Sequence, residues 1–60
     1  MDLKEAFRHL FITQKFDTIQ LDGEEITVFN SEDGETFSAR EFEVGSLTYQ
    51  ALILLEETLT

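Results

Sequence analysis

Two short runs of alternating apolar and polar residues, at positions 16–21 and 25–30, constrain the fold of this 60-residue chain more than any other feature. The dipeptide Asp22-Gly23 lies between them. Asp-Gly favours a two-residue hairpin turn, because both central positions of that turn need a positive φ. The pattern therefore predicts two antiparallel strands, roughly over residues 16–21 and 25–30.

A second turn is predicted over residues 30–35, where Asn, Ser, Asp and Gly are concentrated. The residues that follow favour a third strand over 35–38. The spacing of Ser38 and Glu41 also fits a capping box, which would begin a short helical turn instead. The conformation of residues 39–44 is left open at this stage.

Helical spacing of apolar residues appears at both ends of the chain. Asp2 and Glu5 have the spacing of a capping box, and a first helix is predicted over residues 3–13. Gly45 interrupts the chain, and a C-terminal helix is predicted over residues 47–58. The fold class is α+β: one domain over residues 1–60, with an N-terminal helix, a small antiparallel sheet of two or three strands, and a C-terminal helix packed on the sheet.

A domain of this size buries only about 60% of the surface that its unfolded chain exposes, so its core is marginal. The chain has no cysteine and one histidine, so neither a disulfide nor a structural zinc site can support it. The C-terminal helix is apolar around its whole circumference. Leu54 and Leu55 can face the sheet, whereas Tyr49, Leu52 and Ile53 point partly elsewhere. Either the first helix covers these three, or they form a homodimer interface, or they dock another protein.

A net charge of −9 at pH 7 limits what the chain can bind. Phosphate backbones and anionic lipid surfaces repel such a protein, so direct binding to nucleic acid or to a membrane is disfavoured. Residues 1–15 mix acids with bases and lack a small-residue cleavage site, which argues against a secretory signal. With no apolar run of about 18 residues to span a bilayer, the sequence predicts a cytoplasmic protein.

Acidic residues are concentrated between positions 22 and 43, where only one basic residue, Arg40, accompanies them. These acids are Asp22, Glu24, Glu25, Glu32, Asp33, Glu35, Glu41 and Glu43. We expect the carboxylates to lie mostly unpaired on one contiguous side, because both turns and the outward faces of the strands carry them. Charge repulsion of this kind destabilises a fold.

Three explanations of this acidic surface remain open. It could simply keep a small protein soluble. It could imitate DNA, whose backbone carries one charge per roughly 1.7 Å of axis, so that carboxylates take the places of phosphates in a basic groove of another protein. Calcium binding is the weakest explanation, because the loop over residues 30–41 has glycine at its fifth position and an EF-hand loop requires it at the sixth. No metal site is predicted.

The sequence offers no arrangement suited to catalysis. His9 is the single imidazole and lies beside apolar residues of the first helix. Ser31, Ser38 and Ser46 belong to no motif that would activate a nucleophile, and there is no glycine-rich phosphate loop. We therefore expect neither catalytic residues nor a cofactor, and we do not expect an enzyme.

The segment "DGETFSAREFEV", followed by a capped helix, resembles the small acidic inhibitors of uracil-DNA glycosylase that some Bacillus phages encode. In that family an acidic Asp-Gly hairpin leads to an aromatic-Glu-Val segment and a C-terminal helix. The matching residues here are Glu41, Phe42, Glu43 and Val44, with the helix after them. The resemblance implies a homodimeric DNA mimic, with Phe42 as an apolar contact and Glu43 in the place of a DNA phosphate.

The leading hypothesis is a phage-type DNA mimic that binds a host DNA-processing enzyme with a basic groove, in the host cytoplasm. Uracil-DNA glycosylase is the best guess, although CRISPR effectors, restriction enzymes and RNA polymerase fit the same argument. The predicted partner-binding residues are Glu24, Glu25, Glu32, Asp33, Glu35, Glu41, Phe42 and Glu43. The alternative is a homodimeric interaction module formed through Tyr49, Leu52 and Ile53, whose acidic face serves only solubility.

Overall fold

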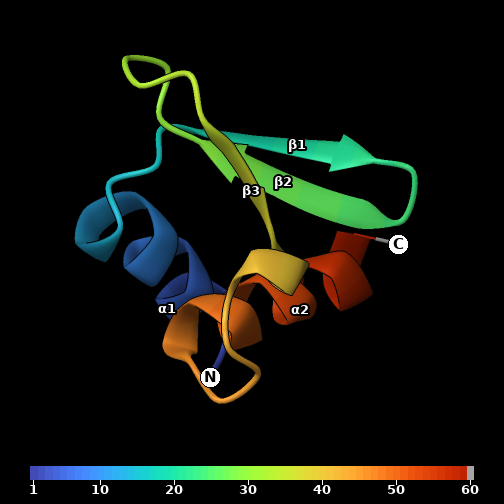
Figure 1. Ribbon diagram of the computed structural model, residues 1–60. Coiled ribbons are helices and arrows are strands. Elements are labelled where there is room, and N and C mark those ends of the chain that lie inside the picture. The colour runs from blue at the N-terminus through green and yellow to red at the C-terminus, as the bar shows by residue number, and fades with distance from the viewer. Residues whose placement is uncertain (60) are drawn as a thin grey trace.

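The computed structural model describes residues 1–59 and has two layers, a three-stranded sheet and a pair of helices beneath it (Figure 1). The elements follow in the order α1 (Leu3–Arg8), a π-helical turn (His9–Thr13), β1 (Thr18–Asp22), β2 (Glu25–Phe29), β3 (Thr36–Ser38), a 3-10 turn (Ala39–Glu41) and α2 (Leu47–Leu59). The predicted α+β class is confirmed, with three strands rather than two.

The first helical segment has the predicted extent, but its second half differs in geometry. The Asp2 side chain accepts a hydrogen bond from the Glu5 N–H at 2.8 Å, which satisfies a free donor at the start of α1. After Arg8 the helix widens, and the Gln14 N–H donates to the His9 carbonyl at 2.9 Å, a bond of the π-helical type. Lys15 then takes a φ of 61° and ends the helical segment.

The sheet has the order β1-β2-β3, with both neighbouring pairs antiparallel. The hairpin is confirmed, but its turn is shifted by one residue: Asp22 ends β1 and pairs with Glu25, so Gly23 and Glu24 are the central residues. Gly23 has a φ of 67°, whereas Asp22 and Glu24 do not have the positive φ that the predicted Asp-Gly turn requires. Leu21 of β1 lies opposite Ile26 of β2. Strand β1 begins at Thr18 rather than at residue 16, because Phe16 is buried in the core and the Asp17 side chain binds the next loop.

Helix α2 begins after Ser46, whose Oγ accepts a hydrogen bond from the Tyr49 N–H at 3.1 Å. It packs against α1 on one side and against β2 on the other. The largest fully buried side chains come from the π-helical turn, β2 and α2: Leu10, Ile26, Val28, Leu52 and Leu55. The first helix thus covers part of the apolar circumference of the C-terminal helix, which is one of the three alternatives weighed for that helix.

The burial of Leu52 corrects the predicted dimer interface. Leu52 is 0% exposed and belongs to the core between the helices and the sheet, so it is unavailable to a second copy. Leu54, expected to face the sheet, is half-buried.

Within residues 1–59, no helix is long and apolar enough to cross a membrane.

Candidate functional site

The turn over residues 30–35 is tied by hydrogen bonds to the segment that precedes β1. The Asp17 carboxylate accepts hydrogen bonds from the Ser31 N–H at 3.0 Å and from the Ser31 hydroxyl at 2.6 Å. It also accepts a bond from the Thr18 hydroxyl at 2.8 Å. The bonds from Ser31 and Thr18 lower the pKa of Asp17 below its usual value of 3.8, because they favour the ionised form.

Asn30 fixes the other side of this turn. Its Nδ2 donates to the Lys15 carbonyl at 2.8 Å, and its Oδ1 accepts from the Glu32 N–H at 2.9 Å. Gly34 closes the turn with a φ of 74°, and its N–H donates to the Asn30 carbonyl at 3.0 Å. The turn, named here the acidic turn, thereby presents three exposed carboxylates: Glu32, Asp33 and Glu35.

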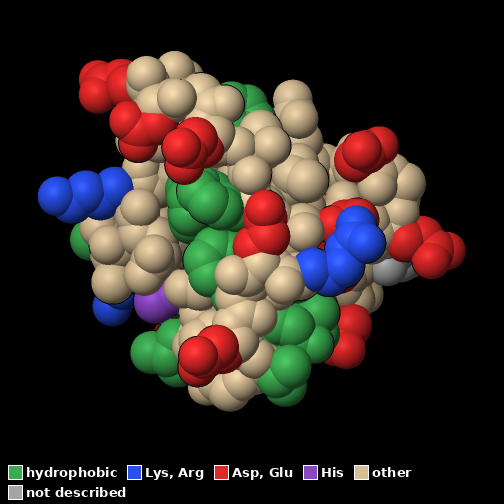
Figure 2. Space-filling model, in the orientation of Figure 1, with side chains coloured by type: hydrophobic (Ala, Val, Ile, Leu, Met, Phe, Trp, Pro, Cys, Tyr) green, Lys and Arg blue, Asp and Glu red, His purple; other side chains and the backbone are tan. Residues whose placement is uncertain are grey.

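The carboxylates do not form one contiguous area, contrary to the expectation from sequence. The acidic turn and the β1–β2 turn lie at opposite ends of β2, which at a rise of about 3.4 Å per residue separates them by about 17 Å. Figure 2 shows acidic side chains in separate groups over this face, with apolar and basic side chains between them. The groups are nevertheless visible from one side of the molecule.

Two of the predicted partner-binding acids have partners inside the protein. The Glu25 carboxylate binds Arg40 Nη2 at 2.9 and 3.1 Å, and bonds from Ser38 and Arg40 lower the pKa of Glu25. Glu41 accepts a hydrogen bond from the Ser38 N–H at 2.8 Å and forms the capping box of the 3-10 turn. The expectation that these carboxylates are unpaired is wrong for Glu25 and Glu41, because each stabilises the local fold.

Phe42, predicted as an apolar anchor, is half-buried rather than freely exposed. Its ring lies 5.9 Å from the ring of Phe37, which in turn lies 5.9 Å from Phe16. This packing fixes Phe42 against the sheet and leaves part of its surface accessible. The next residues, Glu43 and Val44, are exposed.

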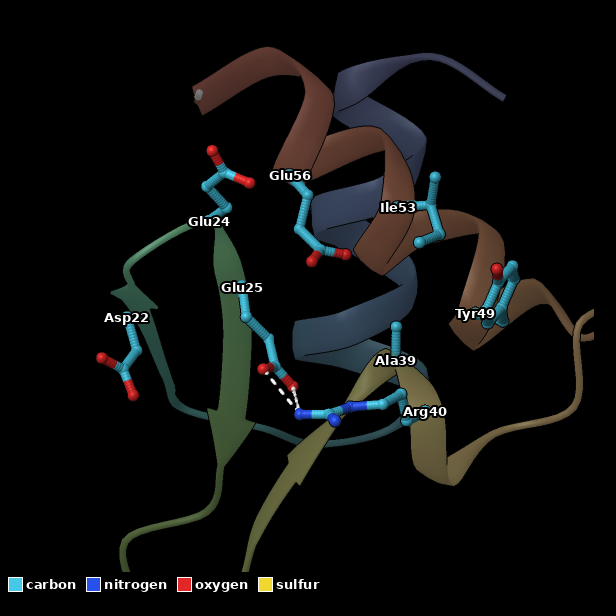
Figure 3. Close-up of a pocket in the computed structure, with 8 residues that line it drawn as sticks. All are labelled: Asp22, Glu24, Glu25, Ala39, Arg40, Tyr49, Ile53 and Glu56. Atoms are coloured by element: carbon cyan, nitrogen blue, oxygen red, sulfur yellow. Dashed lines mark hydrogen bonds and ion pairs between the residues drawn. The ribbon is translucent and has the colours of Figure 1, made fainter.

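A groove of about 530 Å³ lies between the β1–β2 turn, the 3-10 turn and α2 (Figure 3). Its lining combines four carboxylates and one guanidinium with apolar surface from α2 and the 3-10 turn. The lining residues are Asp22, Glu24, Glu25, Ala39, Arg40, Tyr49, Ile53 and Glu56. The groove therefore joins two sets of residues that the sequence had assigned to separate functions: the acids Glu24 and Glu25, and the apolar residues Tyr49 and Ile53.

Sequence reasoning missed the contributions of Asp17, Arg40 and Glu56. Arg40 carried a usable signal, because it is the single base among eight acids over residues 22–43 and is a natural candidate for an ion pair. Asp17 and Glu56 carried no such signal, since their roles depend on contacts between distant segments.

Among residues 1–59, no group of three or more His, Asp or Glu side chains is arranged to hold a metal ion.

The chain matches no protein-family model, and no curated protein or solved structure is significantly similar to it. The likeness of its residues 33–44 to the glycosylase inhibitors thus stays a prediction.

Proposed function

We propose that this protein is an acidic DNA mimic that occupies the basic groove of a DNA-processing enzyme in the cytoplasm of the host cell. The observation that carries the proposal is the acidic turn, in which Glu32, Asp33 and Glu35 project from a backbone fixed by Asp17 and Asn30. A surface already ordered before binding loses little entropy on association. Within residues 1–59, these three carboxylates form no hydrogen bond or ion pair, so they are available to a basic groove.

Two further acids lie outside the acidic turn. Within residues 1–59, the side chains of Glu24 and Glu43 also form no ion pair or hydrogen bond, and both are exposed. Each of these separate acidic groups can contact basic side chains that would otherwise bind the phosphates of a duplex. Exposed charge steers association, and the accessible part of Phe42 supplies the apolar contact. On this proposal the protein is not an enzyme and needs no cofactor.

The test is displacement of DNA from a purified DNA-binding enzyme, with uracil-DNA glycosylase first because of the family resemblance. Inhibition of uracil excision would be titrated with the wild-type chain and with the double variant Glu32→Lys, Asp33→Lys. We expect stoichiometric inhibition by the wild type and a loss of about tenfold or more for the variant, since two attractive contacts become repulsive.

A matched control carries the same change of charge elsewhere. Glu5→Lys with Glu57→Lys alters two exposed acids on the helices and leaves the acidic turn intact. We expect this control to weaken inhibition much less than the turn variant does. An equal loss for both variants would mean that net charge alone acts, and absence of inhibition would exclude this enzyme as the target.

Exposed apolar side chains on the helical layer support a second proposal, a homodimeric interaction module. Ile12 is 67% exposed, Val44 72% and Leu47 57%, and burying them would stabilise a small domain. In this proposal Tyr49 and Ile53 contribute without Leu52, which is buried. Light scattering distinguishes a monomer from a dimer in solution. A monomer mass at high protein concentration would contradict the homodimeric module.

A further inference from the structure

The groove beside α2 differs from the acidic turn because part of its lining is apolar. Tyr49 and Ile53 project from successive turns of α2, and Ala39 lies beneath them (Figure 3). Tyr49 and Ile53 are half-buried and pack against the core, so this wall is firmly positioned. A long basic side chain suits such a surface, because its aliphatic stem packs on apolar groups while its charged end stays in contact with acids. The Tyr49 ring can also attract a cation.

The groove already binds one guanidinium group, that of Arg40. Nη2 of Arg40 contacts both carboxylate oxygens of Glu25, at 2.9 and 3.1 Å. The Arg40 side chain is 82% exposed, whereas that of Glu25 is 35% exposed. The carboxylate is therefore the fixed member of the pair, and the guanidinium is the member that solvent, or a competing group, can reach.

Glu24 adds a second negative charge to the groove. It is exposed at the mouth of the groove, next to Glu25 along the chain (Figure 3). A guanidinium has five donors in a planar fork, so it can bind a carboxylate through two hydrogen bonds and stack on an aromatic ring. An ammonium group lacks that fork, which makes arginine a better fit than lysine.

We propose that this groove binds an arginine side chain from the DNA-binding surface of the partner protein. The stem of that arginine lies against Tyr49 and Ile53, and its guanidinium contacts Glu25 and displaces Arg40 outward, while the charge of Glu24 at the mouth of the groove attracts it. The identity of the partner rests on the proposed function, whereas the preference for arginine rests on the groove itself.

The probe is the capped tripeptide Leu-Arg-Gly, compared with the same peptide carrying citrulline, which keeps the shape of arginine without its charge. Backbone amide shifts of the ¹⁵N-labelled full chain would be followed during titration. We expect the arginine peptide to shift the amides of Glu25, Tyr49 and Ile53 in a saturable manner, and the citrulline peptide to leave them in place. Equal responses to both peptides, or shifts confined to residues 30–35, would overturn the proposal.

Two variants with opposite expected effects sharpen this test. Arg40→Ala removes the internal competitor, so the arginine peptide should bind about threefold more tightly, in line with the modest strength of an exposed ion pair. Glu24→Gln should weaken binding by a similar factor, while Glu57→Gln, outside the groove, should leave it unchanged. Weaker binding by the Arg40→Ala protein, with its amide spectrum otherwise native, would contradict the displacement.

The outcomes also separate this inference from the proposed function. Loss of enzyme inhibition in the acidic-turn variant together with no arginine preference would refute the groove and keep the DNA mimic. Arginine-selective binding without inhibition of any DNA-binding enzyme would keep the groove and refute the DNA mimic.

Discussion

At the scale of single residues, the acids divide into those that the fold uses and those that it leaves free. Asp17, Glu25 and Glu41 each accept hydrogen bonds that fix a turn or a strand end. Their substitution would change the structure as well as the surface. A charge reversal at Glu41 is therefore a poor probe of binding, although the sequence alone made it attractive.

Asp17→Asn should lower stability at neutral pH, because the carboxylate that accepts bonds from Ser31 and Thr18 becomes a neutral amide. The folded-state pKa of Asp17 lies below its usual value of 3.8. Its contribution is thus fully present above that value and is lost as the pH falls through the folded-state pKa.

Urea midpoints of both proteins, measured from pH 7 to pH 2, would check this dependence. The wild type should be the more stable at pH 7, and the two curves should converge at the acidic end. Comparison with the variant matters because protonation of the other acids changes stability in both proteins alike. A constant difference across the whole range would refute a role for the Asp17 charge.

At the scale of elements, most of the fold could be predicted because local signals coincide with tertiary contacts. The β1–β2 hairpin and the cap at Asp2 depend on neighbours within a few residues, and the structure confirms both, although the turn is centred on Gly23 and Glu24. The π-helical turn over His9–Thr13 could not be predicted in this way. An apolar pattern indicates a helix without distinguishing the α from the π form.

The acidic turn depends on Gly34, whose φ of 74° strains any residue with a Cβ. Gly34→Ala should destabilise the chain by about 1 kcal/mol through this strain. A steric clash does not contribute, because a Cβ at this position would meet nothing within 4 Å.

Gly45→Ala is the matched control: space is equally open there and φ lies outside the left-handed region. It should be neutral or stabilise by up to about 1 kcal/mol through the unfolded state. Urea unfolding followed by circular dichroism measures both, and equal effects would contradict the strain argument.

At the scale of the whole molecule, the candidate site was only partly predictable. The sequence identified the acids and the apolar residues of α2, but which of them meet depends on how α2 rotates against the sheet. A helix that is apolar all round gives no signal for that rotation, so Leu52 was assigned to a surface although it is buried. Glu25 pairs with Arg40, and both line one groove with Tyr49, because three elements pack together there.

The same charges should make salt act in opposite directions on folding and on binding. A net charge of −9 on a chain of 60 residues destabilises the compact state by repulsion. Salt shortens the screening length from about 10 Å at 0.1 M to about 3 Å at 1 M and weakens that repulsion. The urea midpoint of the wild type should therefore rise with sodium chloride, while affinity for a basic partner falls.

The Glu32→Lys, Asp33→Lys variant provides the decisive comparison, because it makes the net charge less negative by four. Its urea midpoint should exceed that of the wild type at low salt and should respond less to added salt, while its affinity for the partner is already weakened. Stability gained where binding is lost is the expected signature of charges kept for a partner rather than for the fold. If the variant were instead less stable than the wild type at every salt concentration, these carboxylates would have a structural role, and the argument that folding does not use them would fail.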